Sequence, residues 1–289
     1  MDISIITPSF GQLDWLKLCI ASVADQGEVT TEHIIQDAGS ANMEEWSEDF
    51  KKKHSNLSIH IEKDSGMYDA VNRGILKAKG EIVAYLNCDE QYLPGVLSKV
   101  VNYFSQNPKI DILFADMVVV DPDGKYLCHR KALLPEKYHT LVSSNLAIST
   151  CATFFRRSAI QSNNLYFDTN YKVIGDGEWI LRVIESKIKS AVLREFTSTF
   201  TDTGGNLDLT PNAFREKANL LATAPLWARI SRKAIVGHYR LRRMLAGTYY
   251  QKPFAYEIYT KAQSTARNQF HVPRPTVRWV RPDISKLSN

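Results

Sequence analysis

Residues 57–90 read LSIHIEKDSGMYDAVNRGILKAKGEIVAYLNCDE, in which two β-rich runs flank one helical run. Leu57–Ile61 and Glu81–Leu86 are rich in aliphatic residues, which is typical of buried strands. Between them, apolar or small residues recur three or four positions apart from Met67 to Ala78, as on one face of a helix that Gly80 ends. The stretch therefore predicts a β-α-β unit with parallel strands.

The same alternation extends to the N-terminus, with predicted strands at Ile3–Ile6 and His33–Gln36 and helical spacing over Leu13–Val23. After Pro94, a favourable first residue of a helix, the pattern becomes mixed. Further strands are expected at Ile110–Ala115, Met117–Asp121, Lys125–Arg130 and Ala152–Arg156, then a helix at Asp176–Ser186 and two short strands to Thr201. The prediction is an α/β domain over 1–210, with a parallel half at 1–93 and a mixed half at 94–210, followed by a helical, basic extension at 211–289.

Composition limits the class of protein. The 289 residues are 44% hydrophobic and 23% charged, which excludes wholesale disorder, collagen and coiled coil. The four cysteines lie far apart with no CxxC pair, so we expect reduced thiols in a cytosolic protein. The N-terminus has no pattern of a secretory signal, and no apolar run approaches the roughly 18–20 residues of a membrane-spanning helix. The expected localisation is cytoplasmic.

Charge is unevenly distributed. Residues 1–211 carry 21 Lys and Arg against 28 Asp and Glu, a net −7, whereas residues 212–289 carry 15 against 3, a net +12. Within the basic part, Leu226–Leu245 contains six basic residues and no acid. At helical spacing its apolar residues fall in one sector: Leu226, Trp227, Ile230, Ala234, Gly237, Leu241, Met244 and Leu245.

This apolar stripe has two interpretations. A membrane-surface helix combines an apolar stripe with a basic face, so the segment could bind an anionic inner membrane surface. Alternatively, the helix docks on the catalytic domain through the stripe and leaves its arginines in solvent. Nucleic acid is disfavoured as a partner because the body is acidic and no nucleic-acid motif is present.

Acidic residues follow three of the predicted parallel strands. Asp37, Asp64 and the pair Asp89-Glu90 come at the carboxyl ends, where open parallel sheets bind ligands, and Thr7-Pro8-Ser9 ends the first strand. Clustered carboxylates repel one another, so this rim favours a divalent cation, a donor-rich ligand, or both. A nucleoside diphosphate with its metal supplies both. The alternative is that Asp37 and Asp64 only cap the helices that follow. No GxxxxGK[ST] or GxGxxG phosphate loop is present.

The motifs of residues 1–210 resemble those of the family 2 glycosyltransferases of the GT-A fold, particularly the branch that builds bacterial surface polysaccharides. The most specific blocks are Glu62–Gly74 and Gly80–Glu90. Weaker matches are Ile6–Phe10, Asp37–Ser40, Ala152–Arg157, Phe167-Asp168, Gly175–Trp179 and Gly204-Gly205. The resemblance implies a Rossmann-like nucleotide-sugar-binding half at 1–93 and an acceptor-binding half at 94–210 with a mixed central sheet.

The resemblance also implies roles for individual residues. Asp176 would be the catalytic base, and Asp89 with Glu90 would hold Mg²⁺ or Mn²⁺, Glu90 as the principal ligand. Glu178, Trp179 and Arg156 would lie on the acceptor side. The nucleotide sugar would be bound by Thr7, Pro8, Ser9, Asp37, Asp64, Asn72, Arg73 and Asp89. For Arg73 a phosphate contact and a solvated position remain equal alternatives, and only one of Arg156 and Arg157, which alternate on a strand, is expected to face the cleft.

Three positions depart from the family pattern: Glu90 where a second aspartate is usual, Gly175 where an acid usually precedes the base, and Thr150 where a histidine is frequent. The expected activity is an inverting, metal-assisted transfer from a UDP- or GDP-type sugar to a hydroxyl of a saccharide or lipid-linked acceptor. Two alternatives are a sugar-phosphate nucleotidyltransferase and a nucleotide-sugar-binding module that has lost catalysis.

Overall fold

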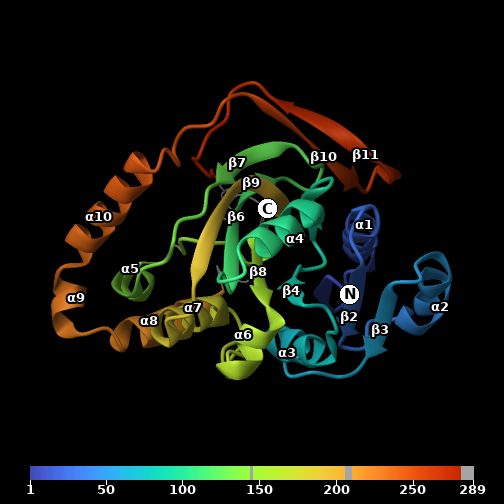
Figure 1. The fold of residues 1–289 in the computed structure, drawn as a ribbon, viewed down its shortest axis with the longest axis horizontal. Coiled ribbons are helices and arrows are strands. Elements are labelled where there is room, and N and C mark those ends of the chain that lie inside the picture. Colours follow the sequence, from blue (N-terminus) through green and yellow to red (C-terminus); the bar gives the residue numbers. More distant parts are fainter. Residues whose placement is uncertain (144–145, 206–209, 281–289) are drawn as a thin grey trace, which may run out of the picture.

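One large mixed sheet runs through the molecule, and the computed structural model describes residues 1–143, 146–205 and 210–280 (Figure 1). Its strands follow the order β3-β2-β1-β4-β8-β6-β9-β5, with β7 paired to β6. The strands are β1 (Ile3–Ser9), β2 (Thr31–Asp37), β3 (Leu57–Ile61), β4 (Ile82–Tyr85), β5 (Glu90–Tyr92), β6 (Ile112–Val120), β7 (Tyr126–Arg130), β8 (Thr153–Arg156) and β9 (Ser190–Thr201).

The predicted parallel half is confirmed. β3, β2, β1 and β4 are parallel neighbours, connected through α1 (Leu13–Ala24), α2 (Met43–Lys53) and α3 (Met67–Lys77). Helix α3 packs tightly on β1: a Cβ at Gly74 would lie 2.4 Å from the Ile6 side chain. At Gly80 a Cβ would lie 2.6 Å from the Ser4 backbone nitrogen. Gly74 therefore lets α3 approach β1 closely, and Gly80 does the same for the turn before β4.

The second half is mixed, as predicted, because β8 runs antiparallel to both β4 and β6 while β6 and β9 are parallel. Its helices are α4 (Val96–Gln106), α5 (Lys137–Val142), the 3-10 turn η1 (Thr150–Ala152), α6 (Arg157–Ser162) and α7 (Gly175–Ser186).

Two strand predictions in this half are corrected, and so is the loop expected at Glu90. The two strands expected on either side of Asp116 are one strand, β6, with an irregular register at that residue, and the two short strands expected before Thr201 are the single strand β9. Glu90, expected in a loop, begins the short strand β5, which pairs with β9. These pairings join segments distant in sequence, so periodicity gives no signal for them.

The C-terminal segment is only partly helical. After α8 (Pro211–Ala222), α9 (Leu226–Ile230) and α10 (Arg232–Leu245), the chain forms a hairpin of β10 (Phe254–Thr260) and β11 (Gln263–Val272). The prediction of a helical segment to the end was therefore wrong beyond Leu245. Tyr256, Ile258 and Val272 are buried in the same hydrophobic cluster as β6, and this alternate burial explains why a strand forms there.

The described helices include none that is both long and apolar enough to span a bilayer. All four cysteines are buried.

Candidate functional site

The loops after β1 and β2 form one polar rim. Asp37 is fully buried, and its carboxylate accepts hydrogen bonds from the Gly39 and Ser40 backbone nitrogens at 2.9 and 2.7 Å and from the Ser40 hydroxyl. The Ser40 Oγ in turn accepts from the Gly11 nitrogen at 2.7 Å. Asp37 thus holds the two loops together and does not cap α2. Ser9 Oγ, at the end of β1, is buried without a hydrogen-bond partner among the described residues.

A hollow of about 440 Å³ lies beside this rim. It is lined by Gly39, Ser40, Asn42, Met43, Glu44, Glu45 and Ile61, which come from the loop after β2, the start of α2 and the end of β3. The hollow is on the expected donor side, at the carboxyl ends of the parallel strands.

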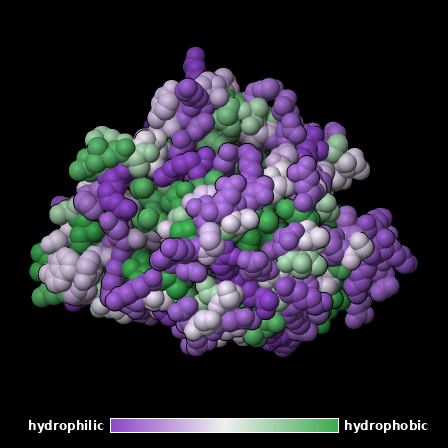
Figure 2. All heavy atoms as spheres, viewed as in Figure 1, coloured by the Kyte–Doolittle hydropathy of each residue, from purple (hydrophilic) through white to green (hydrophobic). Residues whose placement is uncertain are grey.

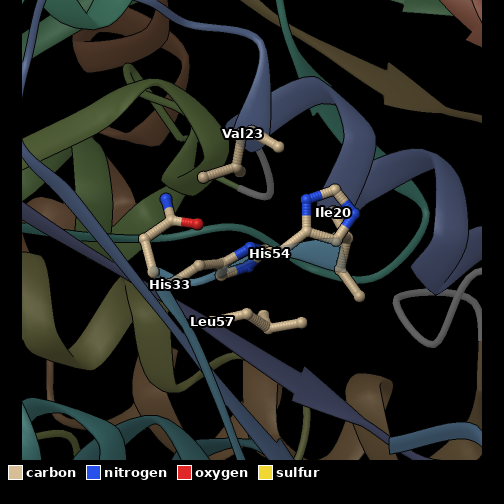
Figure 3. Close-up of a pocket in the computed structure, with 7 residues that line it drawn as sticks. Ile20, Val23, His33, His54 and Leu57 are labelled. Atoms are coloured by element: carbon tan, nitrogen blue, oxygen red, sulfur yellow. The ribbon is translucent and has the colours of Figure 1, made fainter. Parts of the chain in front are cut away.

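Thr7 and Pro8, expected to contact the nucleotide, are buried within β1. The Thr7 hydroxyl lies 2.8 Å from His33 Nε2, inside the core. Figure 3 shows His33 near His54, Ile20 and Leu57, around a small pocket between α1 and the sheet. Burial lowers the pKa of His33 to about 3, so this imidazole is neutral near pH 7. Any contact of Thr7 with a ligand would therefore come from its backbone.

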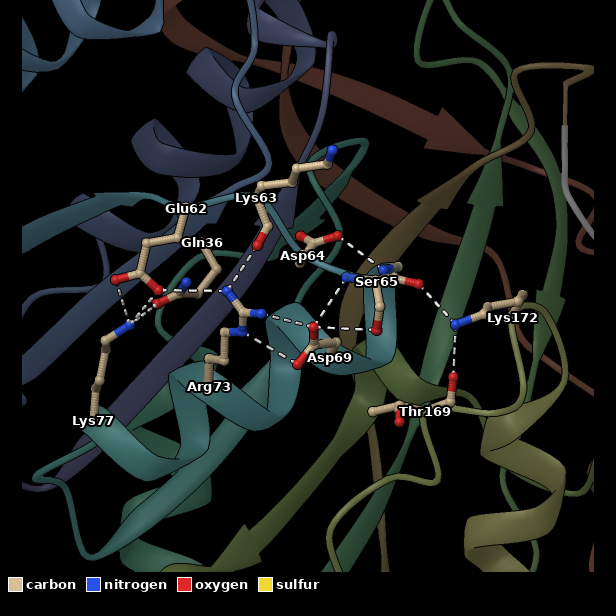
Figure 4. A network of polar contacts seen from close by, with 11 residues as sticks. Gln36, Glu62, Lys63, Asp64, Ser65, Asp69, Arg73, Lys77, Thr169 and Lys172 are labelled. Carbon is tan, nitrogen blue, oxygen red and sulfur yellow. Dashed lines mark hydrogen bonds and ion pairs between the residues drawn. The ribbon is translucent and has the colours of Figure 1, made fainter.

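The loop that carries Asp64 is held by its own helix (Figure 4). Asp64 Oδ1 accepts from the Gly66 nitrogen at 2.9 Å, and Asp69 on α3 accepts from the Ser65 nitrogen at 2.9 Å. Arg73 donates to both oxygens of Asp69 and to the Lys63 carbonyl. Its guanidinium therefore supports the loop. Arg73 is therefore not a freely solvated side chain, and its contact with a phosphate stays a prediction.

Asn72, the next residue predicted to bind the nucleotide sugar, exchanges two hydrogen bonds with the Phe167 backbone. Its amide donates to the Phe167 carbonyl and accepts from the Phe167 nitrogen, both at 2.8 Å. The side chain thereby joins α3 to the segment that precedes α7.

Asp89 and Glu90 lie where β4 ends and β5 begins. Asp89 is partly exposed, and its carbonyl accepts a 2.6 Å hydrogen bond from the Thr201 hydroxyl at the end of β9. Glu90 is only 1% exposed, and its carboxylate accepts from the Asn87 nitrogen at 2.7 Å. Burial raises the pKa of Asp89 to about 6. Burial and then the charge of Asp89 raise the pKa of Glu90 to about 8.

Asp89 and Glu90 fit a divalent cation only if a bound molecule supplies the remaining atoms that coordinate the ion. The described residues contain no group of three or more His, Cys, Asp or Glu side chains arranged to hold a metal ion. Mg²⁺ typically takes one or two carboxylates and completes its shell with water and phosphate oxygens. Two neighbouring carboxylates match that donor set, and the partly exposed Asp89 is the better placed of the two.

Asp176 lies in the first turn of α7 and is linked to α3 by Tyr68. The Tyr68 hydroxyl donates to the Val173 carbonyl at 2.9 Å and accepts from the Asp176 nitrogen at 3.1 Å. A Cβ at Gly175 would lie 2.7 Å from the Tyr68 ring, so a larger residue at this position would clash with that ring. Sequence reasoning missed Tyr68; its signal was an aromatic residue in the first turn of a helix that follows a ligand-binding loop.

The other residues predicted on the acceptor side are Glu178, Trp179 and Arg156, and they lie in three different environments. Glu178 is bound by Arg182 through two bonds of 2.6 and 2.9 Å. Trp179 is 2% exposed and donates to the Leu165 carbonyl from the core. Arg156 pairs with the first residue of β4, at the sheet edge opposite Asp89, and donates to the Ile110 and Phe104 carbonyls. Of the predicted acceptor-side set, Asp176 is thus the carboxylate that the fold brings beside the donor loops.

Glu216 on α8 holds the backbone that leads to Asp176. Its carboxylate accepts hydrogen bonds from the nitrogens of Lys172, Val173 and Ile174 at 2.9, 3.0 and 3.0 Å. These bonds lower the pKa of Glu216 despite its burial. No sequence motif indicated this residue, because the contact spans more than 40 positions.

We expect Glu216→Gln to lower kcat about tenfold with little change in the KM for the donor. Glutamine offers one acceptor oxygen in place of two, and an unsatisfied buried donor costs about 1–3 kcal/mol. The melting temperature should also fall. Glu48→Gln, an exposed change on α2, is the matched control. An unchanged kcat with a lowered melting temperature would make Glu216 purely structural.

Comparisons with known proteins agree on one family. Residues 4–163 match the family described as Glycosyl transferase family 2. An uncharacterized glycosyltransferase of Mycobacterium tuberculosis is 28% identical over 210 residues, covering 68% of this chain and 75% of that protein. The minor teichoic acid biosynthesis protein GgaB of Bacillus subtilis is 23% identical over 207 residues, covering 67% of this chain and 22% of GgaB.

The solved structure of S. aureus TarS 1–349 in complex with UDP-GlcNAc superposes with a TM-score of 0.61 at 17% identity, covering 85% of this chain and 73% of that one. The match covers 44% of a longer TarS structure. At this identity the likeness shows a shared fold.

Proposed function

Because this chain belongs to glycosyl transferase family 2, and is therefore a transferase enzyme, we propose that it moves a sugar from a nucleoside diphosphate sugar to a hydroxyl of a saccharide or lipid-linked saccharide. Family membership excludes the nucleotidyltransferase alternative. A UDP-type donor is favoured over GDP because TarS, which shares the fold, was solved with UDP and with UDP-GlcNAc. A lipid-linked acceptor would bring the enzyme to the inner membrane surface as a peripheral protein.

The proposal rests on one observation: the loops expected to bind the nucleotide sugar lie next to Asp176. Lys172 donates from Nζ to the Ser65 carbonyl at 2.7 Å, and Tyr68 bonds the Asp176 nitrogen. The loop of Asp64 and the start of α7 are therefore neighbours, although more than 100 positions separate them. An acceptor hydroxyl beside Asp176 would face the sugar of a donor lying along the rim.

In the proposed mechanism Asp176 accepts the proton of the acceptor hydroxyl as this oxygen attacks the anomeric carbon. Glu178 is held by Arg182 and does not serve as a second carboxylate nucleophile, so a single displacement with inversion is favoured. Asp89 and Glu90 would hold the divalent cation, which stabilises the charge of the departing diphosphate when bound. The carboxylate of the buried Glu90 accepts a hydrogen bond from the Asn87 nitrogen. This bond orients the loop that presents Asp89.

Thermal stabilisation by nucleotides tests the donor site. We expect UDP and UDP-sugars with Mn²⁺ or Mg²⁺ to raise the melting temperature, because a ligand at 100 times its Kd stabilises the folded state by about 2.7 kcal/mol. GDP and GDP-sugars should give smaller shifts. Slow, metal-dependent hydrolysis of one UDP-sugar would identify the donor. Equal shifts with all nucleotides, or none with any, would contradict the proposal.

A further inference from the structure

The apolar stripe of the C-terminal helices faces outward. Its large side chains on α9 and α10 are all exposed: Leu226 64%, Trp227 51%, Ile230 74%, Leu241 47%, Met244 60% and Leu245 77%. The small residues between them, Ala234 and Gly237, are exposed as well. The stripe predicted from helical spacing is therefore a solvent face, and the interpretation that it docks on the catalytic domain was wrong.

The two helices are attached to the body by a different face. Ala228 is fully buried, Ile235 packs against the cluster that includes α5 and α7, and Tyr239 is 8% exposed and stacked on His139. Arg242 forms an ion pair with Glu136 at 3.0 Å and donates a hydrogen bond to the Leu134 carbonyl. These contacts hold the helices in place and keep the apolar stripe turned away from the core.

Basic side chains border the stripe. Arg229, Arg232, Lys233 and Arg240 are exposed, and no acidic residue lies between 226 and 245. Tyr249 and Tyr250, 41% and 68% exposed, follow directly after α10. Figure 2 shows hydrophobic residues at the left edge of the molecule, over α9 and the far end of α10, with hydrophilic residues between and beside them. We call these exposed apolar, basic and tyrosine residues the α9–α10 face.

We propose that the α9–α10 face binds the surface of an anionic lipid bilayer. A bilayer offers what this surface lacks: an apolar layer for the six large side chains and, directly above it, anionic headgroups for the four bases. Basic residues near such a surface are attracted to its anionic headgroups, and tryptophan and tyrosine favour the headgroup level.

A second copy of the chain is a poorer occupant. Two-fold pairing of this face with itself would bring the four basic residues of one copy against those of the other. The repulsion would be strongest at low ionic strength, where binding to anionic lipid is instead strongest. The inference does not depend on the donor, the cation or the role of Asp176.

Sedimentation with vesicles tests the proposal with the full chain. We expect the protein to sediment with vesicles of equal parts phosphatidylglycerol and phosphatidylcholine, less strongly at high salt, and not with pure phosphatidylcholine. The apolar variant Ile230→Ser/Met244→Ser/Leu245→Ser should lower the affinity at least tenfold. Arg229→Glu/Lys233→Glu should do the same, since it reverses two charges at the lipid surface.

Two controls match these changes elsewhere on the surface. Leu76→Ser alters an apolar side chain of 66% exposure on α3, and Lys51→Glu/Lys52→Glu reverses two exposed charges on α2. Both should bind vesicles like the unaltered protein, and all variants should keep its melting temperature and UDP affinity.

Absence of binding to anionic vesicles, or equal binding by the face variants and the controls, would overturn the inference. Light scattering that shows a dimer abolished by the same face variants, with no vesicle binding, would assign the face to a second copy instead.

Discussion

Asp176→Asn is expected to lower kcat by about 10²- to 10⁴-fold, the usual contribution of a positioned general base. Donor affinity should change little, because Asp176 lies on α7 in the acceptor half and its bond to Tyr68 of α3 is made by the backbone nitrogen, which asparagine keeps. The Asp176 carboxylate accepts a hydrogen bond from the Gly177 nitrogen at 2.8 Å. The side-chain oxygen of asparagine can accept the same bond. The fold should therefore hold, and the melting temperature should stay near that of the unaltered protein.

Steady-state rates with the true acceptor, together with calorimetric donor titration, measure this split between kcat and binding. Glu178→Gln is the matched control on the same helix turn. Its carboxylate is tied to Arg182, so its loss should affect stability more than turnover. Near-normal kcat in Asp176→Asn with a large loss in Glu178→Gln would transfer the role of base to Glu178.

Asp89→Asn is expected to remove the metal-dependent part of UDP binding and to lower kcat/KM by about 10²-fold or more, since a cation at a diphosphate supplies several kcal/mol of charge stabilisation. The amide keeps the size of the side chain but loses the charge that attracts the cation. The backbone position should persist, because the Thr201 hydroxyl binds the Asp89 carbonyl and not its side chain.

UDP titration with Mn²⁺ and with a chelator is the measurement. Asp123→Asn, in an exposed turn far along the chain from this rim, is the control and should show the normal metal dependence. Glu90→Gln separates a ligand from a supporting residue: a loss equal to that of Asp89→Asn makes Glu90 a ligand, and a partial loss makes it a support for the Asn87 loop. UDP affinity that is unaffected by chelator in the unaltered protein would refute the cation site.

The parallel half could be predicted from sequence because its signals are local. The helical spacing of 67–78 and the β-rich runs on either side appear as β3, α3 and β4 almost at the predicted bounds. Parallel strands then place their carboxyl ends on one edge, so the approximate position of the acids followed from topology.

What each side chain does at that edge could not be predicted in the same way. Asp37, Asn72 and Arg73 are occupied by backbone and side-chain partners that hold loops together. A motif identifies such residues as important, but it does not distinguish a ligand contact from a bond that shapes the loop. That distinction depends on which direction each side chain takes once the loops have packed.

Local periodicity determined the apolar spacing of Leu226–Leu245, the strand pattern of 57–90, and the order of acids along the chain, although the segment forms two helices that break at Ser231. The tertiary structure determined the rest: the pairing of β5 with β9, the hairpin after Leu245, the three bonds of Glu216 before Asp176, and the outward direction of the apolar stripe. The physical reason is that the residue spacing within a helix or strand fixes which of its faces is apolar. The segments that cover each face come from distant parts of the sequence. For α10 the body supplied partners for Ile235 and Tyr239 and left the stripe of Leu241 and Met244 exposed.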